Sequence, residues 1–357
     1  MPNSPSFFYK KLIYWYLQNK RELPWRTTTQ PYFIWLSEII LQQTRVNQGI
    51  PYYLKFVKSF PTIEILANAS EENVLKLWQG LGYYSRARNL HLTARYITNQ
   101  LNGVFPNNYK ELIKLKGVGD YTASAISSIC FNEPRAVVDG NVYRVLARVF
   151  GIDIPINSSR GINEFKNLAQ QLVDTKQPGI YNQAIMEFGA RYCVPQNPNC
   201  NTCIFNDRCI AFQKQLVSEL PVKLPKTSII NFFFNYIVII SEDDKTVLRQ
   251  RTEKGIWQKL YEFPLIETSK EVSLPQIKKI PMYLELSKKH MIKSIVLHNE
   301  KSVVHKLSHR HLHTRFWIAE SSEILQNAIP IEKLSTYPVP VLIEKFISLF
   351  FSTETLV

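Results

Sequence analysis

One acidic residue is expected to be buried, where it could take part in catalysis. Glu38 is in the middle of residues 32–46 (YFIWLSEIILQQTRV), which predict a helix that is apolar on nearly all sides. A buried acid is either paired with a cation or kept protonated near neutral pH, because desolvation raises its pKa. A protonated carboxyl is what a general acid requires. A lone buried Glu is structural about as often as catalytic, so both roles stay open for Glu38.

A second carboxylate opens a helix further along the chain. Residues 138–141 (VDGN) precede a helical pattern over 142–149, and Asp139 or Asn141 is a plausible N-cap for it. Capping alone accounts for the aspartate. The two roles are compatible, however, because an aspartate at a helix start is easily kept ionised and can face a developing positive charge.

Four of the five cysteines lie within seventeen residues, with the spacing Cys193-x6-Cys200-x2-Cys203-x5-Cys209, and Cys130 is far from them. An odd number of cysteines without a signal peptide argues against a disulfide framework and for a metal site. Zinc is the general alternative for clustered cysteines, usually held by two C-x2-C pairs, but this segment has only one.

Two glycine-containing turns are candidate contacts to nucleic acid. Gly117 and Gly119 flank one residue between two predicted helices, where exposed backbone N–H groups can hold a phosphate. In residues 79–88 (QGLGYYSRAR), Leu81 and Tyr83 can fill the gap left by an extruded base, while Arg86 and Arg88 hold the phosphates on either side. On their own, both segments are more often simple connections between helices.

The length, net charge and composition are those of a basic globular protein. The chain has 357 residues, a formal charge of +14 and 45% hydrophobic residues, which allows two or three domains and favours a polyanionic partner. Residues 229–240 form the most apolar run, which is too short to span a bilayer and is interrupted by two asparagines. We therefore expect a cytoplasmic protein that does not bind membranes.

The pattern of apolar residues changes near the middle of the chain. Helical patterns cover 7–19, 32–46, 61–101, 112–149 and 163–192, with a non-helical connection at 23–26. Beyond a proline-containing linker at 213–228, strands are predicted at 229–240, 245–251, 293–299 and 314–320, with helices at 274–280 and 339–351. The sequence predicts an all-α domain over 1–212 and an α+β domain over 229–357.

The motifs around Asp139 and Glu38 resemble those of a known family. Residues 117–123 (GVGDYTA), followed by 138–142 (VDGNV), resemble the helix-hairpin-helix and catalytic aspartate of the endonuclease III superfamily of DNA glycosylases. Residues 37–44 (SEIILQQT) resemble its catalytic Glu motif. Bifunctional members have a lysine where this chain has Tyr121, and a tyrosine cannot form their Schiff base. The chain therefore resembles the monofunctional MutY-type adenine DNA glycosylases.

This resemblance implies roles for residues that the pattern alone leaves open. Glu38 would protonate N7 of adenine, and Asp139 would stabilise the sugar cation or form a transient adduct with it, positioned by Tyr121 and Asn141. The remaining implied contacts are to adenine by Trp25, Arg26 and Gln183, and to the duplex by Gln43, Leu81, Tyr83, Arg86, Gly117 and Gly119. Glu187 is expected to be structural.

The cysteine spacing matches the 4Fe-4S loop of the same superfamily, which implies that residues 193–209 bind a 4Fe-4S cluster through Cys193, Cys200, Cys203 and Cys209. Residues 194–199 (VPQNPN) are uncharged, unlike this loop in most relatives, so a phosphate contact by the loop is doubtful.

The C-terminal domain resembles a Nudix domain at residues 248–251 (LRQR) and 255–264 (GIWQKLYEFP), but the acidic metal box that should follow is absent. No pyrophosphatase activity is therefore expected. By resemblance, this domain recognises 8-oxoguanine through a Phe-Ser-His triplet, which here reads Leu307-Ser308-His309, so that stacking is lost and hydrogen bonding is kept.

Taken together, these features predict a repair glycosylase that flips out and removes adenine paired with 8-oxoguanine or guanine in double-stranded DNA. We expect a bacterial, monomeric enzyme that is associated with the nucleoid through DNA. One alternative is a mismatch or pyrimidine-lesion glycosylase of the same superfamily. The other is a non-enzymatic, redox-sensing DNA-binding protein.

Overall fold

The computed structural model describes residues 5–225, 229–325 and 327–353, which form two compact units. The first unit combines residues 1–68 with 89–225, and the second combines residues 69–88 with 226–357.

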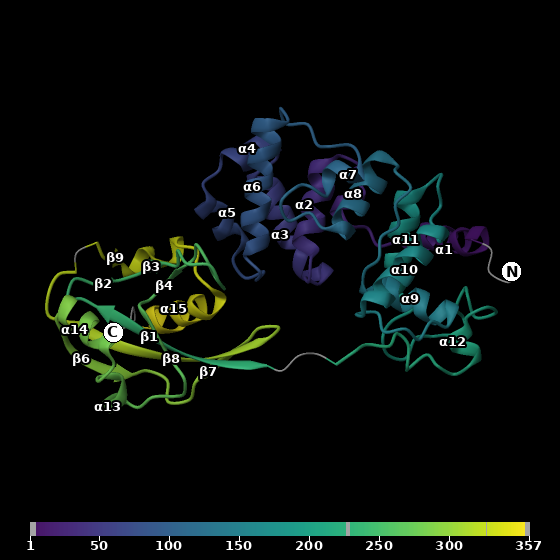
Figure 1. The fold of residues 1–357 in the computed structure, drawn as a ribbon. Coiled ribbons are helices and arrows are strands. Elements are labelled where there is room, and N and C mark those ends of the chain that lie inside the picture. The colour runs from purple at the N-terminus through teal and green to yellow at the C-terminus, as the bar shows by residue number, and fades with distance from the viewer. Residues whose placement is uncertain (1–4, 226–228, 326, 354–357) are drawn as a thin grey trace. The chain divides into compact units, whose positions relative to one another are not determined.

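The first unit is helical throughout its described residues (Figure 1). Its N-terminal part contains α1 (Pro5–Asn19), the 3-10 helix η1 (Pro24–Arg26), α2 (Pro31–Leu41), α3 (Val46–Ser59) and α4 (Ile63–Asn68). The remaining helices are α6 (Ser85–Gln100), of which 89–100 belong to this unit, α7 (Tyr109–Leu112), α8 (Asp120–Phe131), α9 (Gly140–Phe150), α10 (Ser159–Leu172), α11 (Pro178–Arg191) and α12 (Ile210–Gln213).

The core of this unit brings the two ends of its sequence together. Helix α11 packs against α1, α8 and α9, and α2 packs against α8. Phe8 on α1, Val145 on α9 and Phe188 on α11 are at most 1% exposed and belong to one apolar cluster. Burial of such side chains contributes roughly 1.5 to 3 kcal/mol each, which fixes the helices that carry the candidate site.

The structure corrects the prediction of one continuous helix over 32–46. Helix α2 ends at Leu41, Gln43 takes a left-handed conformation with φ 56°, and α3 begins at Val46. The apolar pattern does not reveal this break, because Val46 continues the spacing of the preceding helix. The turn over residues 42–45 is thereby available to line a cavity.

The second unit is built on a mixed sheet. Among its described residues the strand order is β6 (Ile292–Leu297), β8 (Arg310–Ser321), β1 (Ile230–Ile240), β2 (Lys245–Thr246) and β9 (Ile329–Pro330). Strand β5 (Leu265–Thr268) also pairs with β1, β7 (Val303–Lys306) pairs with β8, and β3 (Arg249–Gln250) pairs with β4 (Tyr261–Glu262) separately. Strands β1 and β8 are parallel over eleven pairs, from Ile230 with Arg310 to Ile240 with Glu320.

Helices cover both faces of this sheet. On one face, Phe346 of α15 (Val341–Thr353) stacks on Phe316 of β8, with ring centroids 4.0 Å apart. On the other face, α13 (Leu274–Ile277) and α14 (Pro281–Lys289) join the apolar cluster that contains Trp317. Coverage on both faces explains why residues 234–239 of β1 are all buried, as a strand between two apolar layers requires.

The sequence missed several elements of this unit, namely α14, β4, β5, β7, β9 and the 3-10 helix η2 (Ile331–Thr336). All are short or have no clean alternation of apolar and polar residues. The predicted strand at 245–251 is divided into β2 and β3.

The boundaries of the two units differ from the predicted domains at two places. Part of the predicted linker packs on the helical unit, where Leu220 is 4% exposed and Val222 accepts a hydrogen bond from Ile156 N at 3.0 Å. Residues 226–228 lie outside the described residues.

Residues 69–88, which include α5 (Glu71–Trp78), belong to the second unit. Lys76 Nζ donates to Tyr337 O at 3.1 Å, and Arg88 Nη1 donates to Gln258 O at 2.8 Å.

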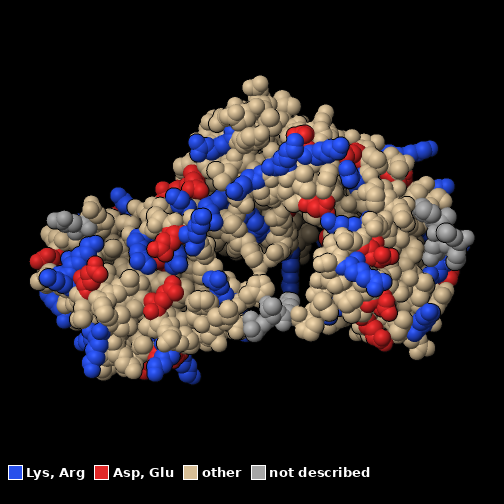
Figure 2. Space-filling model, in the orientation of Figure 1, with Lys and Arg blue, Asp and Glu red and all other residues tan. Residues whose placement is uncertain are grey.

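The surface is basic, as the net charge of +14 requires. Figure 2 shows Lys and Arg side chains spread over one face, with Asp and Glu between them. In the described part of the chain, no helix has both the length and the apolar character that crossing a membrane requires.

Candidate active site

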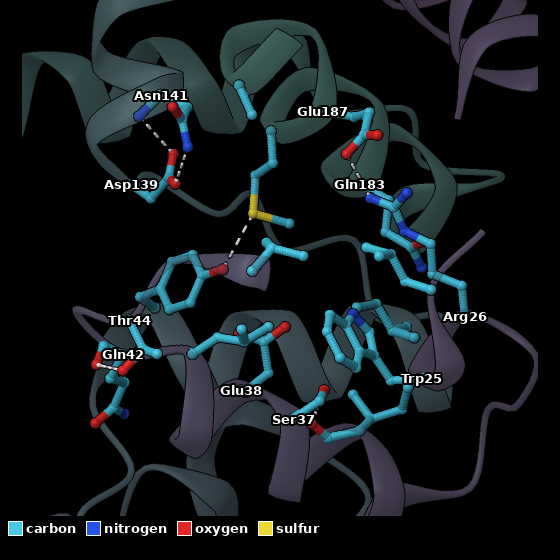
Figure 3. A pocket seen from close by; sticks show the side chains of 18 of the residues that line it. Trp25, Arg26, Ser37, Glu38, Gln42, Thr44, Asp139, Asn141, Gln183 and Glu187 are labelled. Atoms are coloured by element: carbon cyan, nitrogen blue, oxygen red, sulfur yellow. Dashed lines mark hydrogen bonds and ion pairs between the residues drawn. The ribbon is translucent and has the colours of Figure 1, made fainter. Parts of the chain in front are cut away.

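Eight of the residues singled out from the sequence line one cavity of about 540 Å³ in the helical unit. This volume is in the range of sites for small ligands. Figure 3 shows how its walls are made: Glu38 comes from α2, Asp139 and Asn141 from the start of α9, and Gln183 and Glu187 from α11. The eight residues are Trp25, Arg26, Glu38, Gln43, Tyr121, Asp139, Asn141 and Gln183.

Glu38 is partly buried, and its exposed part lines the cavity. Burial raises the pKa of its carboxyl to about 7, hydrogen bonding by Tyr121 opposes this rise, and the charge of Asp139 adds to it. Its neighbours on α2, including Ile34, Ser37 and Ile39, are buried. Glu38 is therefore substantially protonated near neutral pH, which is the state that can give a proton to a bound molecule.

Asp139 is the N-cap of α9, as predicted, and its carboxylate is held by three hydrogen bonds. Asn141 N and Val142 N each donate to Oδ1 at 2.8 Å, and Asn141 Nδ2 donates to Oδ2 at 2.8 Å. Burial has the largest effect and raises the pKa of Asp139 overall, and these hydrogen bonds and the charge of Arg144 offset part of the rise. The donors fix the orientation of the carboxylate and favour its ionised form.

Tyr121 lies at the start of α8 and contributes its hydroxyl to the same cavity. The hydroxyl lies 3.1 Å from Met186 Sδ, a weak acceptor, and Glu38 competes for its single proton. Burial, followed by the charges of Glu38 and Asp139, raises the pKa of this phenol well above its usual value. Tyr121 therefore remains a neutral hydrogen-bond donor beside two carboxyl groups.

An ion-pair network forms the opposite wall. Glu187 is 1% exposed and accepts from Arg21 Nε and Nη2 at 2.7 Å and from Arg26 Nη2 at 2.8 Å. Although burial raises the pKa of Glu187, the hydrogen bonds from the two arginines outweigh burial and lower it to about 2. Glu187 therefore orients Arg26 towards the cavity, in agreement with the expected structural role.

Arg144 links Asn141 to the cysteine loop. Its Nη2 donates to Asn141 Oδ1 at 2.9 Å and to Gly189 O at 2.6 Å, and its Nε donates to Cys193 O at 2.7 Å. A side chain at Gly189 would be 2.7 Å from Asn141 Cβ, so glycine is what lets α9 and α11 approach at this point. The position of Asp139 thus depends on both helices and on the loop.

The four clustered cysteines surround a second, smaller pocket together with Arg148. Burial, together with the charges of the other three cysteines, raises the pKa of Cys203 to about 12. Arg148 is 3% exposed, and its Nη1 lies 3.6 Å from Cys193 Sγ. Such crowded, buried thiols are stable as thiolates only beside a positive partner, which a metal group supplies.

Two carbonyls of the uncharged loop that follows Cys193 bind Arg148, although most residues of the loop are exposed. Val194 O and Pro195 O accept from Arg148 at 2.7 and 2.9 Å. These bonds tie the loop to α9, so they give it a structural role.

The predicted glycine turn at 117–119 is a real turn between α7 and α8. Gly117 has φ 78°, as a left-handed turn requires, but Gly119 is extended at φ −91° and is the N-cap of α8. A side chain at Gly119 would meet nothing within 4 Å, so its backbone is open to an incoming group.

Apart from Gly117 and Gly119, the predicted DNA-contacting residues outside the cavity lie in the second unit. Tyr83 is 47% exposed, and its hydroxyl forms a hydrogen bond with Ser308 Oγ, so the two are neighbours. Leu307 N donates to Arg310 O at 2.8 Å, which closes the hairpin of β7 and β8 around Ser308, and His309 O accepts from Ile230 N of β1 at 3.1 Å.

Leu81 and Arg86 are more buried than DNA-contacting residues are expected to be. Leu81 is 7% exposed and Arg86 is 9% exposed. The Arg86 guanidinium donates to the carbonyls of Leu81 and Gly82 at 3.4 and 3.2 Å and lies 5.0 Å from the Trp78 ring. Arg86 therefore shapes its own turn, which corrects the prediction of a surface arginine that is free to hold phosphate.

The sequence missed several residues that the site depends on. Arg144 is three residues after Asn141 on α9, so helical spacing could have identified it. Tyr16 and Arg21 come from the N-terminal segment and carried no signal, because only packing brings them to α11.

Two family models match the chain. The HhH-GPD superfamily base excision DNA repair protein model covers residues 36–182, and the NUDIX domain model covers residues 235–349. They agree with the predicted helical and Nudix-like domains.

Two relatives illustrate the similarity in sequence. The chain is 36% identical over 313 residues to the adenine DNA glycosylase of Buchnera aphidicola subsp. Baizongia pistaciae, a match that covers 87% of this chain and 86% of the relative. It is 45% identical over 216 residues to the adenine DNA glycosylase of Homo sapiens, which covers 58% of this chain and 40% of the human protein.

Solved structures agree with the helical fold. A thermostable thymine-DNA glycosylase matches at 29% identity with a TM-score of 0.55, covering 59% of this chain and 97% of that protein. An endonuclease III in a DNA complex matches in fold at 20% identity with a TM-score of 0.52, covering 60% and 98% of the two chains. The chain therefore belongs to the adenine DNA glycosylase family, within the HhH-GPD superfamily of base excision DNA repair proteins.

Proposed function

We propose that this enzyme removes undamaged adenine paired with 8-oxoguanine or guanine, after flipping the adenine out of the duplex. The observation that carries the proposal is that Glu38, whose pKa burial raises to about 7, and Asp139, whose carboxylate accepts three hydrogen bonds, line one cavity in the size range of small-ligand sites. Base flipping costs a few kcal/mol, and a mispair lowers this cost.

The proposed chemistry follows from the bond that breaks. Cleavage of the N-glycosidic bond of adenine leaves electrons on the base and positive charge on the sugar, so the base needs a proton and the sugar needs an anion. Glu38 gives its proton to N7 of adenine. Asp139 then stabilises the sugar cation or bonds to it transiently, while Tyr121 and Asn141 hold the carboxylate. The ionised Glu38 finally takes a proton from the water that attacks the sugar.

Tyr121 makes the reaction monofunctional. A lyase step needs a nucleophilic amine at the sugar, and Tyr121 offers a neutral phenol whose pKa is raised well above its usual value. The product is an abasic site in an intact strand.

Recognition of 8-oxoguanine is assigned to the second unit. The contact between Tyr83 and Ser308 supports this assignment, because it joins the predicted intercalating residue to the predicted lesion-reading triplet. Leu307 offers apolar contact in this triplet, and Ser308 and His309 offer hydrogen bonds. The backbone at Gly117 and Gly119 and the basic surface would hold the phosphates, while Gln43 reaches the duplex from the turn after α2.

The cysteine loop is proposed to hold a 4Fe-4S cluster. Across residues 5–225, 229–325 and 327–353, no group of three or more His, Cys, Asp or Glu side chains is placed to hold a metal ion. A single zinc requires four sulfurs about 2.3 Å from one point. Thiols placed around a pocket fit a cluster with one cysteine on each iron. When bound, the cluster ties the loop to α9 and α11.

We further propose that the enzyme acts as a monomer in the bacterial cytoplasm, bound to the nucleoid through DNA. Its positive charge favours binding to the phosphate backbone without regard to sequence.

A panel of duplexes tests the proposal. The enzyme is incubated with adenine opposite 8-oxoguanine, guanine, cytosine or thymine, and with a thymine:guanine mispair, and strand breaks are measured before and after alkali. We expect alkali-dependent breaks at adenine, fastest opposite 8-oxoguanine, and no breaks before alkali. Preferred release of thymine would favour a mismatch glycosylase, and no release from any duplex would favour a non-enzymatic DNA-binding protein.

A further inference from the structure

The side-chain amide of Gln183 is held at one end by a residue outside the cavity. Tyr16 on α1 is 4% exposed, and its hydroxyl donates to Gln183 Oε1 at 2.6 Å. Gln183 lines the cavity, whereas Tyr16 does not. The contact joins the first helix to α11 and places a phenol behind the wall that faces a bound base.

This bond decides which end of the amide is free. A distance of 2.6 Å is typical of an O–H···O bond and is short for a bond from the amide nitrogen. The Nε2 group of Gln183 makes no hydrogen bond to any residue that the structure describes. Because the oxygen is already engaged, the amide offers the cavity a donor.

Glu187 and Arg26, which line the cavity with Gln183, offer no free side-chain acceptor. Glu187 accepts four hydrogen bonds, from the backbone N, Nε and Nη2 of Arg21 and from Nη2 of Arg26. Arg26 has no acceptor, and its Cζ lies 5.3 Å from the centre of the Tyr16 ring. Burial raises the pKa of Tyr16, so the phenol stays a donor towards Gln183.

We propose that Tyr16 is a positioning residue for base specificity, which holds Gln183 so that its NH2 group faces N1 of the flipped purine. Adenine has a lone pair at N1 and accepts this hydrogen bond. A 6-oxopurine such as hypoxanthine carries a proton at N1, so two donors would meet. Without the Tyr16 hydroxyl, the amide can turn over and offer its oxygen to that proton. This inference rests on the proposed adenine-releasing function.

The test compares release of adenine and hypoxanthine opposite 8-oxoguanine by the full chain under single-turnover conditions. Tyr16→Phe keeps the ring and removes the hydroxyl. Since one hydrogen bond changes binding by about 3-fold to 10-fold, we expect the preference for adenine over hypoxanthine to fall by about this factor. Adenine release should become slower and hypoxanthine release faster.

Two controls separate positioning from general stability. Tyr32→Phe removes another buried hydroxyl with a 2.6 Å bond, to Phe60 O, and Tyr32 does not line the cavity. This variant should keep the wild-type preference. In a Gln183→Ala background, Tyr16→Phe should no longer change the preference, because its effect acts through the amide.

A measurement on the unmodified enzyme covers the case in which Tyr16→Phe fails to fold. 1-Deazaadenine has the shape and amino group of adenine but lacks N1, so wild-type release should slow by about 3-fold to 10-fold after correction for its acid depurination rate. An unchanged rate would overturn the proposal, as would an unchanged preference in folded Tyr16→Phe or an equal change in the Gln183→Ala background. If the wild-type chain releases neither base, the proposed function fails first, and this inference fails with it.

Discussion

The exchange Glu38→Gln separates the proton on Glu38 from everything else that this side chain contributes. Glutamine has nearly the shape of a protonated glutamate but cannot ionise or transfer a proton. In the folded chain, burial raises the pKa of Glu38 from 4.5 to about 7. The variant should therefore lose activity and gain stability at the same time, and the gain in stability should depend on pH.

The direction of the stability change depends on whether the folded or the unfolded chain binds the Glu38 proton more tightly. The folded chain binds the Glu38 proton more tightly than the unfolded chain, so the wild-type free energy of unfolding falls as pH rises from about 4.5 to about 7. Glu38→Gln lacks this fall. Its advantage over the wild type should be under about 1 kcal/mol at pH 5 and about 3 kcal/mol at pH 8.

The same proton determines the activity. General acid catalysis contributes about 10²-fold to 10⁴-fold, so Glu38→Gln should lose adenine release by at least the lower figure while it still binds the mispair. Wild-type release should decline above pH 7 as Glu38 loses its proton.

Single-turnover release and urea unfolding at pH 5 and pH 8 measure both effects. Glu164→Gln, at an exposed position on α10, makes the same chemical change far from the cavity and should alter neither. Near-normal release by Glu38→Gln would refute the assignment of the acid. A stability difference that is the same at both pH values would refute the argument from burial.

Two further predictions concern the cysteine loop and its link to Asp139. Arg144→Leu removes hydrogen bonds to Asn141 Oδ1, Gly189 O and Cys193 O, so we expect about 10-fold slower adenine release with little change in mispair binding, checked by single-turnover kinetics and gel shift. An unchanged rate would show that Asn141 positions Asp139 without Arg144. Purified enzyme should be brown and contain iron and acid-labile sulfide in equal amounts by elemental and colorimetric analysis. A colourless protein that contains zinc would contradict the proposed cluster.

Much of the molecule could be predicted from the order of its residues. Helical spacing up to residue 192 and longer apolar runs beyond residue 229 predicted a helical and a sheet-containing part, because each period reflects which side chains a single element buries. Glu38 was identified in the same way, since apolar residues surround it on one helix. Asp139 was recognised as an N-cap because capping depends on a few neighbouring residues only.

Other features depend on contacts between distant parts of the chain. The break at residues 42–45 cannot be seen in the apolar spacing, because Val46 continues the spacing of α2 across four polar residues. The inward turn of Arg86 depends on Trp78 and on the carbonyls of its own turn. Short strands such as β7 are held by β8 and have little pattern of their own.

The pairing of Tyr16 with Gln183, and the cavity that Glu38 shares with Asp139, arise when α1, α2, α9 and α11 pack together. Local spacing can show what a residue is able to do. The residue that it faces, and how far burial moves its pKa, are decided by tertiary packing, because both depend on atoms from other helices.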